Sequence, residues 1–190
     1  ATLLYPVTNR PFRELYELAE GWSETVRMEV IETALKSRSR RDELLRAFRT
    51  AVYAFDIVMD IGAYRDMHRH RRCQQFRQPF TTSLGYDTPE PITTAKLNGA
   101  YESLIADTFL EAGSIGAPAG EYLLPFATRS RFLFKMDFAE AEYISRLRSG
   151  VKGHFSYRNI AWEMKRKLSE IEPALARLID ATPPWIEDPL

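Results

Sequence analysis

The chain has 190 residues, of which 45% are hydrophobic and 27% charged, a composition typical of a folded domain that excludes a disordered segment. Its 26 basic and 26 acidic residues cancel, which argues against a nucleic-acid binder, because such proteins are usually basic over much of their surface. A single cysteine excludes an internal disulfide and fits a reducing compartment.

No apolar run approaches the roughly 18 residues of a membrane span, and no signal-peptide pattern opens the chain. We therefore expect a cytoplasmic protein without a membrane partner. The length suits one domain over residues 1–190. Because the first residue is not Met, we also expect a processed chain or a domain cut from a longer protein.

The N-terminal part predicts two helices. Residues 3–7 suit a short edge strand or an arm, since Pro6 cannot donate to a strand ladder. Residues 11–22 have apolar side chains at helical spacing, and Ser23 suits the N-cap of a second helix over 23–36.

The next stretch, residues 42–59, predicts a helix because its apolar residues recur with helical period. A strand over 55–61 is the alternative, and Gly62 is the expected break. The apolar residues concerned are Leu44, Leu45, Phe48, Val52, Phe55 and Met59.

Residues 81–92 predict a loop, and Thr93 or Thr94 is the expected cap of a helix that ends near Gly113. Residues 126–135 alternate basic and aromatic side chains, which predicts a strand with one basic face.

Two further helices complete the chain. Asp137 and Glu140 form a capping-box pattern at the start of a helix over 137–148. The last helix is expected over 154–179, with a kink at Pro173.

The basic segment, which we define as residues 65–77, stands out from this neutral chain. Five arginines and one aspartate give it a local charge of +4. Such a cluster repels itself, so an anionic ligand or an acidic partner is the first functional hypothesis. A solvated surface face is the alternative. The arginines are Arg65, Arg69, Arg71, Arg72 and Arg77.

Arg65 and the string Arg69-His70-Arg71, which follow the apolar stretch 51–61, resemble the signature of the flavin-dependent thymidylate synthases, also called thymidylate synthase complementing proteins. Further features keep the order and spacing of that family over about residues 51–168. They are Tyr101, Ala112-Gly113, Leu124-Pro125 and Leu147-Arg148.

The resemblance implies an α+β fold, with a small mixed or antiparallel sheet and several packed helices, behind a helical N-terminal part over residues 1–50. It also implies a homo-oligomer, since the family forms tetramers with sites between subunits. A second domain in a longer protein is a further expectation.

The resemblance also implies a reaction, in which FAD carries a hydride from NADPH and dUMP accepts a carbon from methylenetetrahydrofolate. Arginine suits such ligands because its guanidinium binds phosphate with two hydrogen bonds. The implied FAD contacts are Arg65, Arg69, His70 and Arg71. The implied substrate contacts are Arg77, Arg148 and Arg158, and no catalytic residue is assigned.

The polar half of the motif departs from the family. Gln74 and Pro79 stand where the family has serines, and Thr81 and Thr82 replace an Arg-Tyr pair of the nucleotide site. Pro79 offers neither a hydroxyl nor a backbone N–H, so any ligand contact made from that position is lost.

The later helices depart in the same way. Glu121 stands where the family has an arginine before Leu-Pro. Ile160 stands where the family has an arginine that reaches the nucleotide phosphate, and Arg158 lies two positions earlier, on another part of the helix face. The nucleotide-binding half is therefore degenerate.

Three hypotheses follow. In the first, the chain is a working enzyme of this family with an unusual site. In the second, it is a family member that has lost or changed its reaction, and it serves as a scaffold or as half of a tandem protein. The third is an unrelated helical module whose arginines meet RNA or an acidic protein, with Phe76 and Phe80 stacking on bases.

His68, His70 and Cys73 have a ligand-like spacing, but five neighbouring arginines oppose a divalent cation, so no metal site is predicted. Cys73 is either a nucleophile activated by those arginines or a buried structural residue, and we favour the second.

Overall fold

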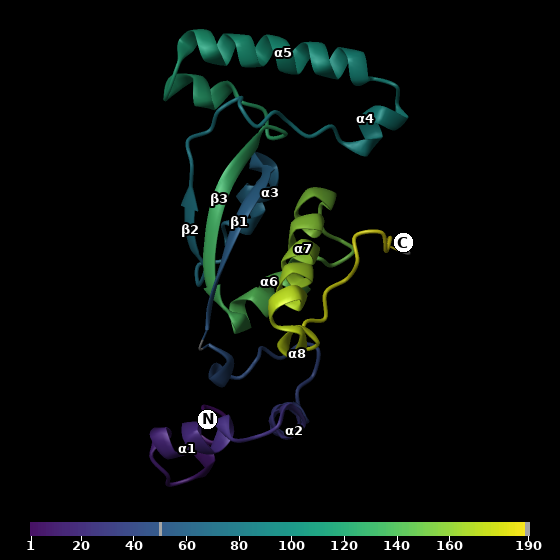
Figure 1. Cartoon of the computed structure of the whole chain (residues 1–190). Helices are drawn as coiled ribbons and strands as arrows, with labels where there is room; N and C mark the ends of the chain where they lie inside the picture. The colour runs from purple at the N-terminus through teal and green to yellow at the C-terminus, as the bar shows by residue number, and fades with distance from the viewer. Residues whose placement is uncertain (50, 189–190) are drawn as a thin grey trace.

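The computed structural model describes residues 1–49 and 51–188, and its centre is a three-stranded antiparallel sheet. The strands lie in the order β1 (Val52–Asp60), β3 (Arg129–Asp137), β2 (Gln74–Arg77), so the last strand in sequence is the middle one in space (Figure 1). Helices complete the fold, and the predicted α+β class is confirmed.

β3 carries the centre of the hydrophobic core. Its residues alternate between two faces, and the buried face presents Phe132, Phe134 and Met136. β1 pairs with β3 along its whole length, and β2 pairs with the other edge of β3. The predicted strand with one basic face is confirmed, although it begins later than residue 126.

The helix predicted over residues 42–59 is wrong. That stretch holds one 3-10 turn, η2 (Arg46–Phe48), followed by β1. Tyr53, Phe55 and Ile57 alternate toward the core, and pairing with β3 satisfies the backbone of this strand, so the period of two prevails over the helical spacing. The alternative strand over 55–61 was nearer to the structure.

α3 (Ile61–Met67) follows β1 directly because Asp60 caps it, with Oδ1 accepting the Ala63 N–H at 2.7 Å. The break expected at Gly62 falls one to two residues earlier, where β1 ends and α3 begins, and Gly62 itself lies in the first turn of α3. A Cβ there would lie 3.0 Å from Asp60 Oδ1 and 3.4 Å from Phe126 Cβ. Glycine therefore serves a close approach and not a helix end.

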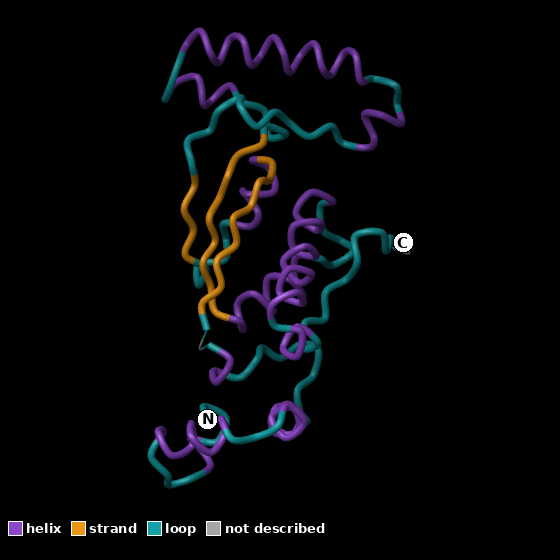
Figure 2. The backbone as a smooth tube through the Cα atoms, viewed as in Figure 1, coloured by secondary structure: helices purple, strands orange, loops and turns teal. Residues whose placement is uncertain are grey.

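α6 (Phe138–Arg148) and α7 (Phe155–Ile171), together with α3, cover one face of the sheet (Figure 2). The predicted start of α6 is confirmed, because the Asp137 side chain accepts the Glu140 N–H at 2.9 Å. The predicted last helix is confirmed as well, with α7 interrupted before α8 (Pro173–Ala176).

The N-terminal part holds η1 (Tyr5–Val7), α1 (Phe12–Glu20) and α2 (Glu24–Leu35). Both predicted helices are confirmed, and the Ser23 side chain accepts the Val26 N–H at 3.3 Å as the expected cap. The edge strand predicted at residues 3–7 is wrong, since the segment turns around its proline.

α4 (Glu90–Thr94) and α5 (Asn98–Ile115) precede η3 (Ala119–Leu123), and α5 crosses the end of the sheet (Figure 1). The start predicted for α5 falls instead at the end of α4, because Lys96, with a φ of 57°, turns the chain between the helices. No helix in the described residues, α5 included, is both long and apolar enough to cross a membrane.

Gly120 tests how η3 docks on α5. A Cβ at this position would lie 2.2 Å from the Ala112 carbonyl oxygen, so Gly120→Ala must push the two elements apart. We expect a loss of about 1–3 kcal/mol in the free energy of unfolding, measured by urea denaturation. Gly99→Ala is the control, since nothing lies within 4 Å of a Cβ there. Equal stability of the two variants would contradict this packing.

Candidate functional site

The basic segment runs from the last turns of α3 through a tight turn into β2. The Cys73 N–H donates to the His70 carbonyl at 3.1 Å, and Gln75 Nε2 donates to the same oxygen at 3.2 Å. These bonds close the turn, and the side chains of His70 and Arg72 meet α6.

His70 is 6% exposed, and both of its ring nitrogens face groups of its own chain. Arg148 Nε donates to His70 Nε2 at 2.8 Å, so Nε2 carries no proton and Nδ1 carries it. Nδ1 faces Glu140 Oε1 at 3.6 Å, and the ring edge meets Tyr143 at a centroid distance of 5.8 Å. The structure thus brings together two of the predicted site residues, His70 and Arg148.

Glu140 is the acid that holds this group together. It is 3% exposed in the first turn of α6, where the helix N-terminus favours a negative charge. Its Oε2 lies 3.3 Å from Arg72 Nη1, and Arg72 also contacts both oxygens of Asp137 at 3.2 Å. Glu43 lies 3.9 Å from the same arginine.

Three predicted flavin contacts lie nearer the surface. The Arg65 guanidinium stacks over the Phe126 ring at 5.1 Å, and Arg69 pairs with Asp66 at 3.1 Å. Arg71 is exposed and forms no ion pair with the described residues. The structure therefore does not gather these arginines around His70.

Arg77, a predicted substrate contact, lies at the end of β2. Its guanidinium is 3.7 Å from Glu121 Oε2 and 4.4 Å from the centroid of the Phe80 ring. Acids of the chain thus pair with three of the five arginines in the basic segment, Arg69, Arg72 and Arg77. The acids concerned are Glu43, Asp66, Glu121, Asp137 and Glu140.

Arg158, the other predicted substrate contact, is buried and binds backbone. It donates to the carbonyls of Ser149 at 3.2 Å, Pro183 at 3.3 Å and Ile186 at 2.7 Å. These bonds fix the C-terminal segment against α7. A substrate role for Arg158 stays a prediction that its contacts do not support.

Cys73 is buried, and burial together with the Glu140 charge raises the pKa of its thiol to about 12. This agrees with a structural cysteine and not with an activated nucleophile. In the described part of the chain, no three His, Cys, Asp or Glu side chains are grouped closely enough to hold a metal ion.

A cavity of about 450 Å³ lies at the other end of α3, beside the start of α7. Asp60 lines it from a buried position, and burial, aided by the charge of Asp87, raises the pKa of the Asp60 carboxyl. His154 Nδ1 and Ser156 Oγ, 2.7 Å apart, line the same cavity. The aromatic walls are Phe126, Phe155 and Tyr157.

Sequence reasoning missed Asp60 as a site residue. Its only sequence signal is an acidic residue between a strand and a helix, which reads as a helix cap. Its burial depends on contacts that are distant in sequence.

Comparison of the sequence with those of known proteins identifies the family of this chain. A sequence model of the thymidylate synthase complementing proteins matches residues 11–174. The chain belongs to this family. The match extends beyond the 51–168 stretch of the resemblance and includes most of the N-terminal helical part.

The curated relatives are proteins named only UPF0159. The one from Chlamydia muridarum is 31% identical over 178 residues, which is 92% of this chain and 34% of that protein. The one from Thermoplasma acidophilum is 34% identical over 150 residues, 75% of this chain and 30% of that protein. The chain thus spans about a third of the length of the curated relatives it matches.

The departures from the thymidylate synthase complementing protein motif lie together in the structure. Gln74 begins β2 with an exposed side chain, and Pro79 follows the strand, also exposed. Thr81 Oγ1 and Ser83 Oγ bond each other at 2.7 Å in the next turn. The region that completes the nucleotide site in the family is a self-bonded surface turn in this chain.

Asp60→Asn tests the buried carboxyl. Burial raises the pKa of the Asp60 carboxyl in the folded state above its ordinary value of 3.8. The contribution of this carboxyl to the free energy of unfolding is therefore fully present below pH 3.8 and is lost as the pH rises through the folded-state pKa. Asparagine keeps the cap and removes the charge, so the variant should melt higher than the wild type at pH 7, with a smaller difference near pH 4.

Asp137→Asn is the matched control. It changes the N-cap of α6 but breaks the ion pair with Arg72, and should melt lower than the wild type at pH 7. A lower melting temperature for Asp60→Asn at pH 7 would show that the carboxylate stabilises the fold, against this account.

Proposed function

We propose that this chain is a thymidylate synthase complementing protein domain that keeps the family fold without the family reaction, and that acts as a structural scaffold. The observation that carries the proposal is the state of His70. Its two ring nitrogens face Arg148 and Glu140, and its ring is buried. The histidine of the Arg-His-Arg string is therefore held by side chains of its own chain.

The residues do not fit a flavin site of the family type. A flavin would need a free His70 nitrogen or gathered arginine forks, but Arg72 is bound to α6 and Arg69 to Asp66. Binding through His70 would have to break its buried contacts with Arg148 and Glu140, which costs about 1–3 kcal/mol for each buried group left without a partner. FAD is therefore not assigned to this chain.

The residues that the resemblance assigns to nucleotide binding also lack the features of a phosphate site. Glu121 stands where the resemblance implies a cation and lies 3.7 Å from Arg77, so a negative charge at this place opposes the binding of a phosphate. Arg158 is saturated by backbone carbonyls. A dianionic phosphate thus finds no free arginine pair at these positions, which supports the loss of dUMP binding.

A scaffold role also suits the lengths of the relatives, since this chain corresponds to about a third of each. We propose that the domain acts beside other segments of a longer polypeptide. RNA binding has less support, because three of the five arginines in the basic segment, Arg69, Arg72 and Arg77, already pair with acids of the chain.

The function is tested by flavin content and activity. We expect the purified chain to be colourless, to bind no stoichiometric FAD, and to form no dTMP from dUMP, NADPH and methylenetetrahydrofolate. An absorption spectrum after addition of FAD and washing measures the first two. Yellow protein with one flavin per chain would overturn the proposal, whatever the activity assay gave.

The network itself is tested by Glu140→Gln. Glutamine removes the buried charge that His70 and Arg72 face, while Arg72 keeps its contact with Asp137, so we expect a loss of about 1–3 kcal/mol in the free energy of unfolding. Glu43→Gln is the control: Glu43 is an exposed partner of the same arginine, and its loss should cost less than about 1 kcal/mol. Similar losses for both variants would refute a central role for Glu140.

A further inference from the structure

The cavity of about 450 Å³ beside α3, which we call the Asp60 cavity, contains a buried carboxylate that lacks a counter-ion. Asp60 is 7% exposed and forms no ion pair with the described residues. Its Oδ1 accepts the Ala63 N–H at 2.7 Å. An ionised carboxylate offers about four acceptor sites, so one backbone donor leaves this buried group short of partners.

The polar groups beside Asp60 do not supply the missing partner. His154 Nδ1 accepts the backbone N–H of Ser156 at 3.4 Å, so this ring nitrogen carries no proton. The Ser156 hydroxyl lies 2.7 Å from the same nitrogen and must therefore donate to it. A bond from this hydroxyl to Asp60 would lower the pKa of the carboxyl, but the single hydroxyl proton cannot serve both acceptors.

The surroundings of Asp60 carry a net negative charge. A second cavity of about 510 Å³ adjoins the first, since Asp60, Asp87, Phe155 and Ser156 line both. Four acids and two arginines line the two cavities, and they give a charge of −2. The acids are Asp60, Asp66, Asp87 and Glu90, and the arginines are Arg65 and Arg129.

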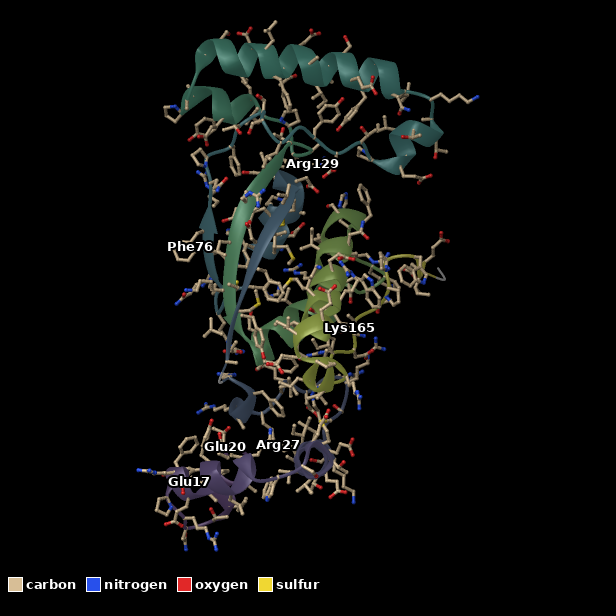
Figure 3. All side chains as sticks on the ribbon, in the orientation of Figure 1. Glu17, Glu20, Arg27, Phe76, Arg129 and Lys165 are labelled. Carbon is tan, nitrogen blue, oxygen red and sulfur yellow. The ribbon has the colours of Figure 1, made fainter. Side chains whose placement is uncertain are left out.

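Ion pairs balance part of this charge. Arg129 pairs with Asp87, and Arg69, which lies outside the cavities, pairs with Asp66. Figure 3 shows Arg129 near the end of the sheet that α5 crosses. Counting Arg69, the group keeps a charge of −1, and Asp60 is its buried carboxylate without an ion pair.

The aromatic walls of the Asp60 cavity are partly open to solvent. Phe126 is 57% exposed and Phe155 is 45% exposed. Phe126 already attracts a cation of the chain, because the Arg65 guanidinium stacks over its ring at 5.1 Å. Aromatic faces attract cations more strongly where water is excluded. Accessible rings beside a buried carboxylate therefore suit a positive group that is carried on an apolar body.

We propose that the Asp60 cavity binds a small organic cation, whose protonated nitrogen pairs with Asp60 and whose apolar body lies against the aromatic walls. The volume suits such a ligand, since small-molecule sites measure about 300–1,000 Å³. The proposal goes beyond the scaffold role and does not rest on it, because neither His70 nor Glu140 lines the cavity.

The class of ligand is tested with 2-phenylethylamine, which is protonated at pH 7. We expect a dissociation constant of about 1 mM by isothermal titration calorimetry. The melting temperature should rise by about 3–5 °C at about 10 mM amine. 2-Phenylethanol and 3-phenylpropionate have a similar shape without the positive charge, and each should bind at least tenfold more weakly. No binding of the amine, or equal binding of all three compounds, overturns the proposal.

Asp60→Asn tests the carboxylate. The variant should bind 2-phenylethylamine at least tenfold more weakly, although its melting temperature at pH 7 should exceed that of the wild type. Asp56→Asn is the matched control, because Asp56 lies on the same strand, pairs with Arg131 and does not line the Asp60 cavity. Unchanged affinity in Asp60→Asn, or an equal loss in both variants, would place the amine elsewhere.

Phe155→Ala tests the aromatic walls with a side chain that is too exposed to be needed for folding. The dissociation constant for 2-phenylethylamine should rise at least threefold. Phe76→Ala is the control, since Phe76 is an exposed phenylalanine outside the cavity, and Figure 3 shows it pointing away from the helices. Equal affinity of the Phe155→Ala and Phe76→Ala variants would contradict the proposed pose of the ligand.

Discussion

The carboxylate of Glu140, buried between Arg72 and His70, is the contact on which the arrangement of the basic segment depends. It lies where the N-terminus of α6 favours negative charge, and it receives a cation and an imidazole from the turn before β2. Without it the buried ring of His70 would lose a partner, which costs more than the loss of an exposed contact. The same contact fixes the orientation of His70 and, through it, of Arg148.

This network explains how a family fold can persist while its site changes. In the thymidylate synthase complementing proteins, arginines at these positions serve anionic ligands by the resemblance. In this chain Arg69 pairs with Asp66 and Arg77 lies beside Glu121. We propose that these acids relieve part of the repulsion within the basic segment, so that the fold does not need a ligand for that purpose. The proposed scaffold role follows from that change.

Local signals predicted much of the fold, and long-range pairing decided the rest. The caps at Ser23 and Asp137 were visible in sequence because they act over three residues. β1 was misread because its apolar residues fit two periods, and only its partner β3, more than 70 residues later, selects the strand. The resemblance predicted which residues belong to the site, but it did not predict how these residues are arranged in space. The bond between His70 and Arg148 joins residues 78 positions apart, and Glu140 showed in sequence only as part of a cap.

The tautomer of His70 tests the central claim most directly. The chain has three histidines, so long-range ¹⁵N–¹H spectra can resolve each ring, with His70→Gln assigning the signal. We predict that His70 Nε2 accepts from Arg148 and that Nδ1 carries the ring proton, unchanged when FAD is added. A proton on Nε2, or a shift of the His70 signals on addition of FAD, would show that this ring serves a ligand and would contradict the account.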